Sequence, residues 1–111
     1  MTHYMNLKKS PFEMIKSGYK TIELRLWDEK RSLIKANDEI VFACDGETLT
    51  VRAIALHRFE NFQSLYKSLD LLKCGYLADE LANAKADDMD VYYPAEKQQK
   101  YGVVGIEIEV I

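Results

Sequence analysis

The sequence lacks the features that mark several large classes of protein. Its two cysteines, Cys44 and Cys74, lie thirty residues apart, form no CxxC pair and follow no secretory leader. Neither a disulfide framework nor a cysteine-based zinc site is therefore expected, and reduced thiols in a cytoplasmic protein are favoured. No apolar run approaches the length that is needed to cross a bilayer, so we expect no membrane association.

An excess of positive charge is also missing. The 111 residues carry a formal net charge of −3, whereas a protein that coats long stretches of nucleic-acid backbone needs a strongly basic surface. The average hides an asymmetry, because residues 8–35 hold eight Lys or Arg side chains against four acidic ones and residues 36–111 hold seven against fourteen. We expect an anionic partner to meet the N-terminal third of the chain.

Common catalytic motifs are absent as well. No His, Cys and Asp cluster has the spacing of metal ligands, no glycine-rich loop precedes a helix, and no serine stands in a nucleophile elbow. We therefore expect neither a metal nor a cofactor. His57 lies in an apolar stretch and is expected to be a structural group, while His3 is expected to be a bystander near the terminus.

The order of the patterned segments predicts an α+β fold. Strands are expected over residues 3–7, 21–27, 39–44, 48–59 and 102–111, with several short helices over residues 61–100 and a loop over residues 28–36. Asp45-Gly46 is typical of a hairpin turn, so the strands before and after it should be antiparallel. This order suits a small β-barrel with helices over one opening, where a ligand pocket is common. No linker or repeat divides residues 1–111, so we expect one domain.

The first helix has clear boundary signals. Ser10 is expected to cap it, with Pro11 in the first turn and Glu13 at the third position of a capping box. Phe12 is expected on the buried face, and Gly18 should end the helix in a left-handed conformation.

The best candidate site follows that glycine, in the stretch GYKTIELR over residues 18–25. Strict alternation places Ile22, Leu24 and Leu26 on one strand face and the polar residues with Trp27 on the other. Glu23 and Arg25 should therefore share a face and be able to share a ligand. Arg25 suits a bidentate contact to phosphate or carboxylate.

Lys20 belongs to this site only if the chain bends between Gly18 and Thr21, since strict alternation would put it on the opposite face. There it would supply a point charge or, if desolvated, a nucleophile or base. The alternative for Glu23 and Arg25 is an ordinary ion pair on an exposed strand.

Two aromatic residues complete the set of candidate ligand-binding residues. Trp27 shares the face of Arg25 and would stack on a base, or else cover one end of the barrel. Tyr93 is one of several tyrosines near the last predicted helices and would line the far side of a cleft, or else pack as a half-buried side chain.

The stretch GYKTIELR resembles the GxKxxExR signature of the ASCH domain, a PUA-like group named after activating signal cointegrator homology. Three further features are similar to small bacterial members: the capped helix, the turn at residues 35–40 and the terminal strand at residues 100–108. Where the family has a turn glycine this chain has Asn37, which also tolerates the left-handed conformation.

The resemblance implies a PUA-like, mixed or antiparallel barrel with helices packed over one side and a cleft for RNA or a nucleotide-like small molecule. One branch of the family hydrolyses an acetylated cytidine with a lysine, a threonine and a glutamate, and another member is similar to a ribonuclease. Lys20 matches the catalytic lysine, but Glu23 stands at the position of the threonine.

Two functions follow as hypotheses. The first is a module that binds RNA or a modified nucleoside through Lys20, Glu23, Arg25, Trp27 and Tyr93. The alternative is a small hydrolase in which Lys20 is the nucleophile or base, Glu23 transfers the proton and Arg25 stabilises the developing charge. Both require Lys20, Glu23 and Arg25 to line one pocket, with a far wall between Phe62 and Tyr101.

Overall fold

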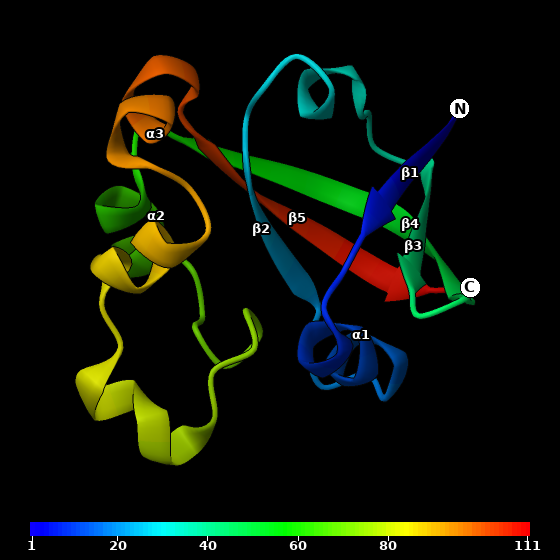
Figure 1. The fold of residues 1–111 in the computed structure, drawn as a ribbon, viewed down its shortest axis with the longest axis horizontal. Helices are drawn as coiled ribbons and strands as arrows, with labels where there is room; N and C mark the ends of the chain where they lie inside the picture. The colour runs from blue at the N-terminus through cyan, green and yellow to red at the C-terminus, as the bar shows by residue number, and fades with distance from the viewer.

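In the computed structural model of residues 1–111, the chain forms one curled sheet of five strands (Figure 1). The sheet order is β1-β3-β4-β5-β2, with β1 parallel to β3 and every other pair antiparallel. The strands are β1 Thr2–Asn6, β2 Ile22–Leu26, β3 Glu39–Cys44, β4 Glu47–Phe59 and β5 Val103–Val110. All five lie where the sequence pattern predicts strands.

The helices gather in two places. α1 (Lys9–Lys16) lies near the beginning of β2, whereas α2 (Phe62–Ser68) and α3 (Ala95–Tyr101) form a layer beside the sheet together with the 3₁₀ turns η2 (Ala78–Asn83) and η3 (Ala86–Val91) (Figure 1). The 3₁₀ turn η1 (Arg31–Leu33) falls inside the predicted loop. A curled half-barrel with helices on one side confirms the predicted α+β class. No helix has the length and apolar character that crossing a membrane requires.

The predicted cap of the first helix is wrong. α1 begins at Lys9, its N-cap residue is Lys8, and no side chain caps it, so Ser10 is already helical and the box with Glu13 does not form. Pro11 still falls in the first turn, where its missing N–H costs nothing. The end of the helix is as predicted, with Gly18 at φ +85°.

The turns set the strand order. Asp45 at φ 49° and Gly46 at φ 82° join β3 to β4 in the expected hairpin. β4 is one long strand whose register shifts between Ala53 and Ala55. β2 does not extend this hairpin but pairs with β5, so the last strand of the chain lies between β4 and β2.

Two apolar cores lie on the two faces of the sheet. One core fills the curl and includes Phe42 and Ile106, and the other joins the sheet to the helical layer and includes Leu24 and Phe62. Ile22, Leu24 and Leu26 all belong to the second core, as the alternation predicts. The polar residues of β2 therefore face the interior of the curl and not open solvent.

His3 differs from its expectation as a bystander. It is buried, and its Nε2 lies 2.9 Å from Oδ2 of Asp38, just before β3. Since β1 is short and lies at the edge of the sheet, this contact helps to fix it there.

Candidate functional site

Glu23 joins the two predicted cations in one buried ion-pair group. Its Oε1 lies 2.9 Å from Nζ of Lys20, and its Oε2 accepts a hydrogen bond of 2.8 Å from Nε of Arg25. The side chain of Glu23 is 4% exposed, and those of Lys20 and Arg25 are 11% and 12% exposed. The exposed ion pair that was the alternative for Glu23 and Arg25 is thus excluded.

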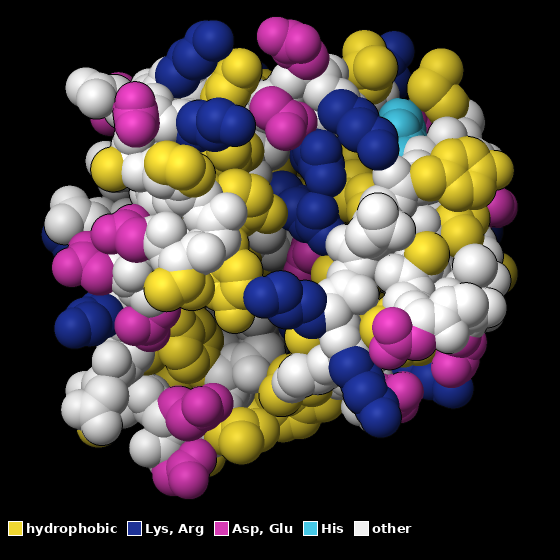
Figure 2. Space-filling view, in the orientation of Figure 1, with side chains coloured by type: hydrophobic (Ala, Val, Ile, Leu, Met, Phe, Trp, Pro, Cys, Tyr) yellow, Lys and Arg dark blue, Asp and Glu magenta, His cyan; other side chains and the backbone are white.

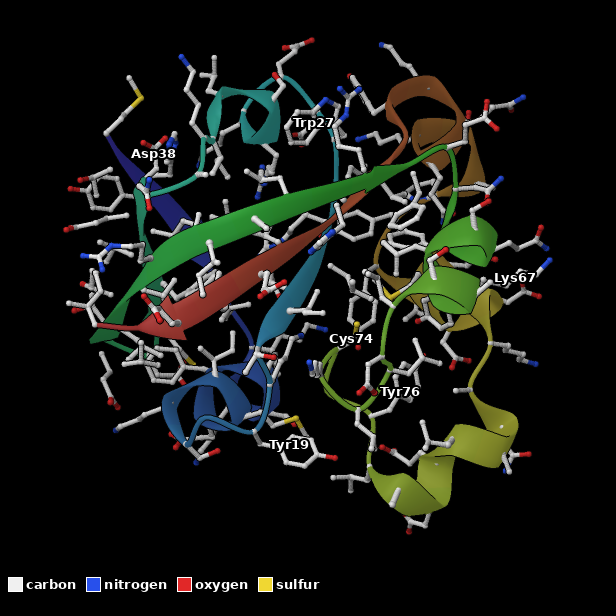
Figure 3. All side chains as sticks on the ribbon, turned by 180° about the vertical axis from the view of Figure 1, so that it is seen from behind. Tyr19, Trp27, Asp38, Lys67, Cys74 and Tyr76 are labelled. Atoms are coloured by element: carbon white, nitrogen blue, oxygen red, sulfur yellow. The ribbon has the colours of Figure 1, made fainter.

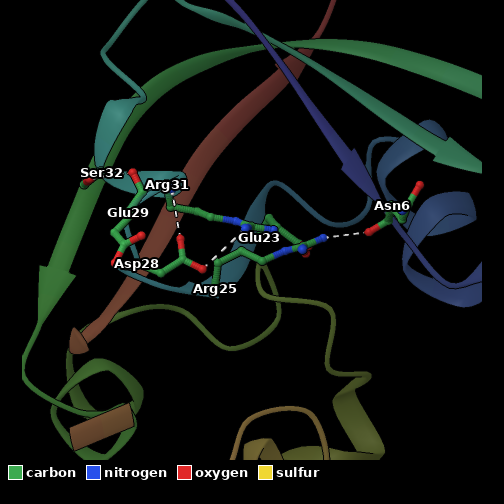
Figure 4. A network of polar contacts seen from close by, with 7 residues as sticks. All are labelled: Asn6, Glu23, Arg25, Asp28, Glu29, Arg31 and Ser32. Atoms are coloured by element: carbon green, nitrogen blue, oxygen red, sulfur yellow. Dashed lines mark hydrogen bonds and ion pairs between the residues drawn. The ribbon is translucent and has the colours of Figure 1, made fainter. Parts of the chain in front are cut away.

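Arg25 also closes the seam of the curled sheet. β1 and β2 are the two edge strands and are not paired with each other. The Nη2 of Arg25 donates a hydrogen bond of 2.9 Å to the carbonyl of Asn6, the last residue of β1, as Figure 4 shows. A guanidinium therefore bridges the two edges where backbone hydrogen bonds are missing.

A bend brings Lys20 into the site, as the hypothesis required. The backbone N–H of Lys20 donates to Met14 in α1, and those of Thr21 and Ile22 both donate to the carbonyl of Lys73, so regular alternation starts only after Lys20. The lysine stem passes beside Gly75, where an added Cβ would lie 3.2 Å from Cδ of Lys20. Gly75 thus leaves room for the lysine, and sequence reasoning missed it.

The two cations keep Glu23 ionised. Burial by itself would raise the pKa of Glu23, but the charges and hydrogen bonds of Lys20 and Arg25 outweigh it and the pKa falls below its ordinary value. Burial likewise opposes the charge of Arg25, while the carboxylate of Glu23 raises the pKa of Arg25 overall. The group therefore holds two positive charges and one negative charge.

These residues line a cleft of about 520 Å³ between the sheet and the helical layer. Figure 2 shows the hollow, with Lys and Arg side chains along the seam and an acidic group recessed among them. Its near wall comes from the end of β1 and from α1, and its far wall comes from Tyr66, Cys74, Tyr76, Met89, Tyr92 and Tyr93. Lys20, Glu23 and Arg25 thus line one hollow, opposite residues that lie between Phe62 and Tyr101.

The far wall is ordered by a chain of hydrogen bonds. The hydroxyls of Tyr66 and Tyr76 are 2.7 Å apart, and the Tyr76 hydroxyl donates to Oδ2 of Asp88 at 2.8 Å. Tyr93 stacks on Phe62 with ring centroids 6.3 Å apart. Burial raises the pKa of Tyr76 and of Tyr93, so both hydroxyls stay protonated. Of these groups only Tyr93 was among the sequence candidates, because the irregular segment around Tyr76 gives no periodic pattern.

Trp27 lies outside this cleft. It borders a second hollow at the end of β2, where the Arg58 guanidinium lies 4.6 Å from the centroid of its indole ring. Figure 3 shows Trp27 near one end of β2, and Cys74 and Tyr76 near the other. The alternation assigned the face of Trp27 correctly but could not say how far along the strand the cleft extends.

The histidine, cysteine and carboxylate side chains form neither a metal cluster nor a disulfide. No group of three or more His, Cys, Asp or Glu side chains is arranged to hold a metal ion. Cys44 and Cys74 are free, and burial raises the pKa of Cys74 to about 11, which keeps this thiol neutral beside Lys20.

Comparisons with known proteins identify one family and two similar structures. The model of the ASCH domain matches residues 5–111. No curated protein matches the chain at a significant level. Two solved structures are similar over all of this chain: the crystal structure of hypothetical protein PH0355, with 34% identity, 100% of its chain covered and a TM-score of 0.85, and the solution structure of protein PF0455 from Pyrococcus furiosus, with 36% identity, 98% of its chain covered and a TM-score of 0.75. This chain therefore belongs to the ASCH domain family and has its PUA-like α+β fold.

Proposed function

We propose that the cleft binds one unpaired RNA base or a modified nucleoside. The observation that carries this proposal is that two largely buried cations, Lys20 and Arg25, share one buried carboxylate on the floor of a cleft whose far wall is rich in tyrosine. The volume of about 520 Å³ lies within the usual range for small-ligand sites. An RNA-binding role is also what the ASCH family suggests in general terms.

The charge of the cleft favours a neutral polar ligand over a phosphate-rich one. Its lining contains three basic and three acidic side chains: Lys8, Lys20, Arg25, Glu23, Glu80 and Asp88. A polyphosphate would therefore meet no net positive charge, although the N-terminal third is basic. A base or ribose does not need a net positive charge for its binding, because it is recognised through single carbonyl, amine and hydroxyl groups.

Hydrogen-bond donors for such a ligand remain free on the floor. A lysine ammonium has three N–H donors, and Lys20 uses one of them toward Glu23. Arg25 uses Nε toward Glu23 and Nη2 toward Asn6, which leaves its Nη1 without a protein acceptor. A carbonyl oxygen of the ligand would accept from these donors while its ring lies against the tyrosines.

The aromatic wall supports stacking. Proteins that recognise single-stranded RNA commonly stack unpaired bases on aromatic rings, and this stacking tolerates many base types. Tyr93 stacks on Phe62, and Tyr92 is 55% exposed at the rim with the Lys8 ammonium 5.4 Å from its ring centroid. Tyr93 and Tyr92 thus offer one partly buried and one exposed ring.

The hydrolase alternative is less well supported by this geometry. A nucleophilic or basic Lys20 would need a free amine, but its Nζ is engaged 2.9 Å from the ionised carboxylate of Glu23. Glu23, which is ionised and engaged by two cations, is also poorly placed to deliver a proton. Lys20 is therefore assigned a binding role as a charged donor.

Binding is tested by calorimetry with cytidine, acetylated cytidine, the other common nucleosides and short single-stranded RNAs. Arg25→Ala should weaken binding about tenfold or more, because a charged donor is lost inside a partly dry cleft. Lys8→Ala should change affinity less than about threefold, since Lys8 is exposed and its attraction is screened. If Arg25→Ala and Lys8→Ala weaken binding equally, and moderate salt removes both effects, the protein binds the nucleic-acid backbone without specificity.

Turnover of the same acylated nucleosides and RNAs separates the two functions. We expect no turnover, and we expect Lys20→Arg to retain much of the binding because a guanidinium keeps the charge. Turnover that rises with pH and disappears in Lys20→Arg would identify a hydrolase with Lys20 as its base or nucleophile. Turnover that survives Lys20→Arg would contradict both assignments of Lys20.

A further inference from the structure

A second hollow of about 700 Å³ opens between the end of β2, the end of β4 and α3. Trp27, Arg58, Tyr101 and Lys100 contribute to its walls, and Glu60 is its one acidic residue. The cleft described above has equal numbers of basic and acidic residues, so the two cavities differ in charge. The second hollow has a surplus of one positive charge.

The second hollow continues the polar face of the cleft. Arg25 of β2 is paired with Val104 of β5, which is paired in turn with Arg58 of β4. Directly paired residues present their side chains to the same face of a sheet, so Arg58 lies on the face of Arg25. Trp27 is two residues beyond Arg25, about 7 Å further along the chain on that face.

Arg58 is a cation without an acidic partner. Its side chain is exposed and makes no hydrogen bond or ion pair, while its guanidinium lies over the indole of Trp27, 4.6 Å from the ring centroid. A guanidinium in this position can still offer its outer face and its N–H groups to a ligand. Lys100 likewise has no acidic partner. Its ammonium lies over the Tyr101 ring, 5.0 Å from the ring centroid.

Positive charge also gathers on the surface beside the cleft. Figure 2 shows Lys and Arg side chains along the seam between the helical layer and the sheet. Arg31 lies near Arg25 in Figure 4, where it pairs with Asp28 at 3.4 Å, and its buried Nε has no hydrogen-bond partner. An anionic strand that leaves the cleft along the seam would pass these cations, of which Arg58 and Lys100 have no acidic partner.

We propose that the second hollow holds the nucleotide next to the one in the cleft, so that the ligand is a single-stranded RNA of at least two nucleotides. Arg58 and Lys100 contact the phosphate that links the two nucleotides. The base of the second nucleotide stacks on the outer face of the Arg58 guanidinium, which lies over Trp27. Bases stack on guanidinium planes as well as on aromatic rings. This inference extends the proposed function, because the first nucleotide occupies the cleft.

The tryptophan makes the proposal directly measurable, since the chain contains only one. Fluorescence of Trp27 is recorded while uridine or the hexanucleotide of uridylate is added. The hexanucleotide should quench the fluorescence and bind at least about tenfold more tightly than uridine. Uridine in the cleft should leave the fluorescence nearly unchanged. Quenching by uridine and hexanucleotide alike, or by neither, would overturn the proposal.

Arg58→Gln provides the second readout, with Arg52→Gln as its matched control on the same strand. Arg58→Gln should weaken hexanucleotide binding about fivefold to tenfold and reduce the salt dependence of log K by about 0.7, as expected for one lost phosphate contact on a single strand. Uridine affinity should not change. Arg52 pairs with Glu109 instead and does not line the second hollow, so Arg52→Gln should alter neither ligand by more than about twofold.

Failure of this proposal is distinguishable from failure of the proposed function. If Arg25→Gln weakens both ligands while Arg58→Gln weakens neither, the cleft binds and the second hollow does not. If the hexanucleotide quenches Trp27 and depends on Arg58 but not on Arg25, the second hollow binds RNA and the assignment of the cleft is wrong. Circular dichroism of each variant checks that the fold is intact.

Discussion

Glu23 is the residue on which the site depends. It is 3% exposed as a whole residue and yet ionised, because each of its two oxygens faces a cation. An exposed ion pair contributes at most about 1 kcal/mol to stability, but the loss of one partner from a buried pair leaves a charge uncompensated and costs about 3–5 kcal/mol. The same three side chains therefore stabilise the fold and line the cleft.

Arg25→Met tests this double role at the level of one side chain. We expect the free energy of unfolding to fall by about 3 kcal/mol, at the low end of the range because Lys20 still pairs with Glu23. The carbonyl of Asn6 also loses its donor across the seam. Urea unfolding followed by circular dichroism measures the change.

Arg52→Met is the matched control for this measurement. Its ion pair with Glu109 is long, at 3.7 Å, and both side chains are about half exposed, so its loss should cost less than about 1 kcal/mol. If Arg25→Met and Arg52→Met lower the free energy of unfolding equally, the buried charge of Glu23 does not need Arg25 for its compensation.

At the scale of elements, β1 is held by contacts that gather on Asp38. The carboxylate of Asp38 lies 3.4 Å from the N-terminal ammonium and 2.9 Å from Nε2 of His3, and it accepts a hydrogen bond of 3.0 Å from the backbone N–H of Lys35. The hydrogen bond with His3 is the main reason that the pKa of Asp38 falls from 3.8 to about 2. One carboxylate thus joins the first strand to the turn before β3.

This lowered pKa predicts an acid-sensitive stability. A carboxyl whose folded-state pKa lies below its unfolded value stabilises the fold above the unfolded value, and this contribution is lost as the pH falls from about 3.8 to about 2. The free energy of unfolding should therefore exceed that of Asp38→Asn at pH 5, and the difference should shrink toward zero near pH 2. A difference that stays constant over this range would show that the charge of Asp38 does not hold β1.

Local patterns predict the elements whose structure is decided locally. The alternation of β2, the Asp45-Gly46 turn and the end of α1 at Gly18 could each be predicted because a few adjacent residues determine them. Gly105 shows the limit of this reasoning. A Cβ there would lie 2.6 Å from Cδ1 of Leu69 and 3.1 Å from Cγ2 of Ile22, so a larger residue would force these side chains to shift, and no pattern around Gly105 indicates either contact.

At the scale of the whole molecule, the residues on the floor of the site were predictable, whereas for the far wall the sequence indicated its region and Tyr93 but not its other residues. Lys20, Glu23 and Arg25 lie within six residues, so strand geometry and the family signature are enough to bring them together. Tyr76 and Asp88 belong to an irregular segment whose side-chain directions are set by packing against the sheet. The position of Trp27 in a separate hollow likewise depends on where α3 lies.

The distribution of charge over the molecule predicts how salt affects RNA binding. The net charge is −3, the cleft is lined by equal numbers of basic and acidic residues, and unpaired cations flank the second hollow. Each phosphate neutralised on a single strand contributes a slope of about −0.7 to log K against log salt concentration. A hexanucleotide has five linking phosphates, so a protein that coats its backbone would give a slope of about −3.5.

We expect a much shallower slope for this protein, about −0.7 to −1.4, because only one or two phosphates lie near Arg58 and Lys100 while the first nucleotide is held by hydrogen bonds and stacking. Titrations of the hexanucleotide between about 50 and about 200 mM salt measure it. Uridine, which carries no phosphate, is the control and should bind with almost no salt dependence.

A slope near −3.5 would mean that the basic N-terminal third coats the strand, since only a surface that neutralises every linking phosphate produces that value. A slope near zero would mean that Arg58 and Lys100 do not contact phosphate, and that the ligand ends at the cleft.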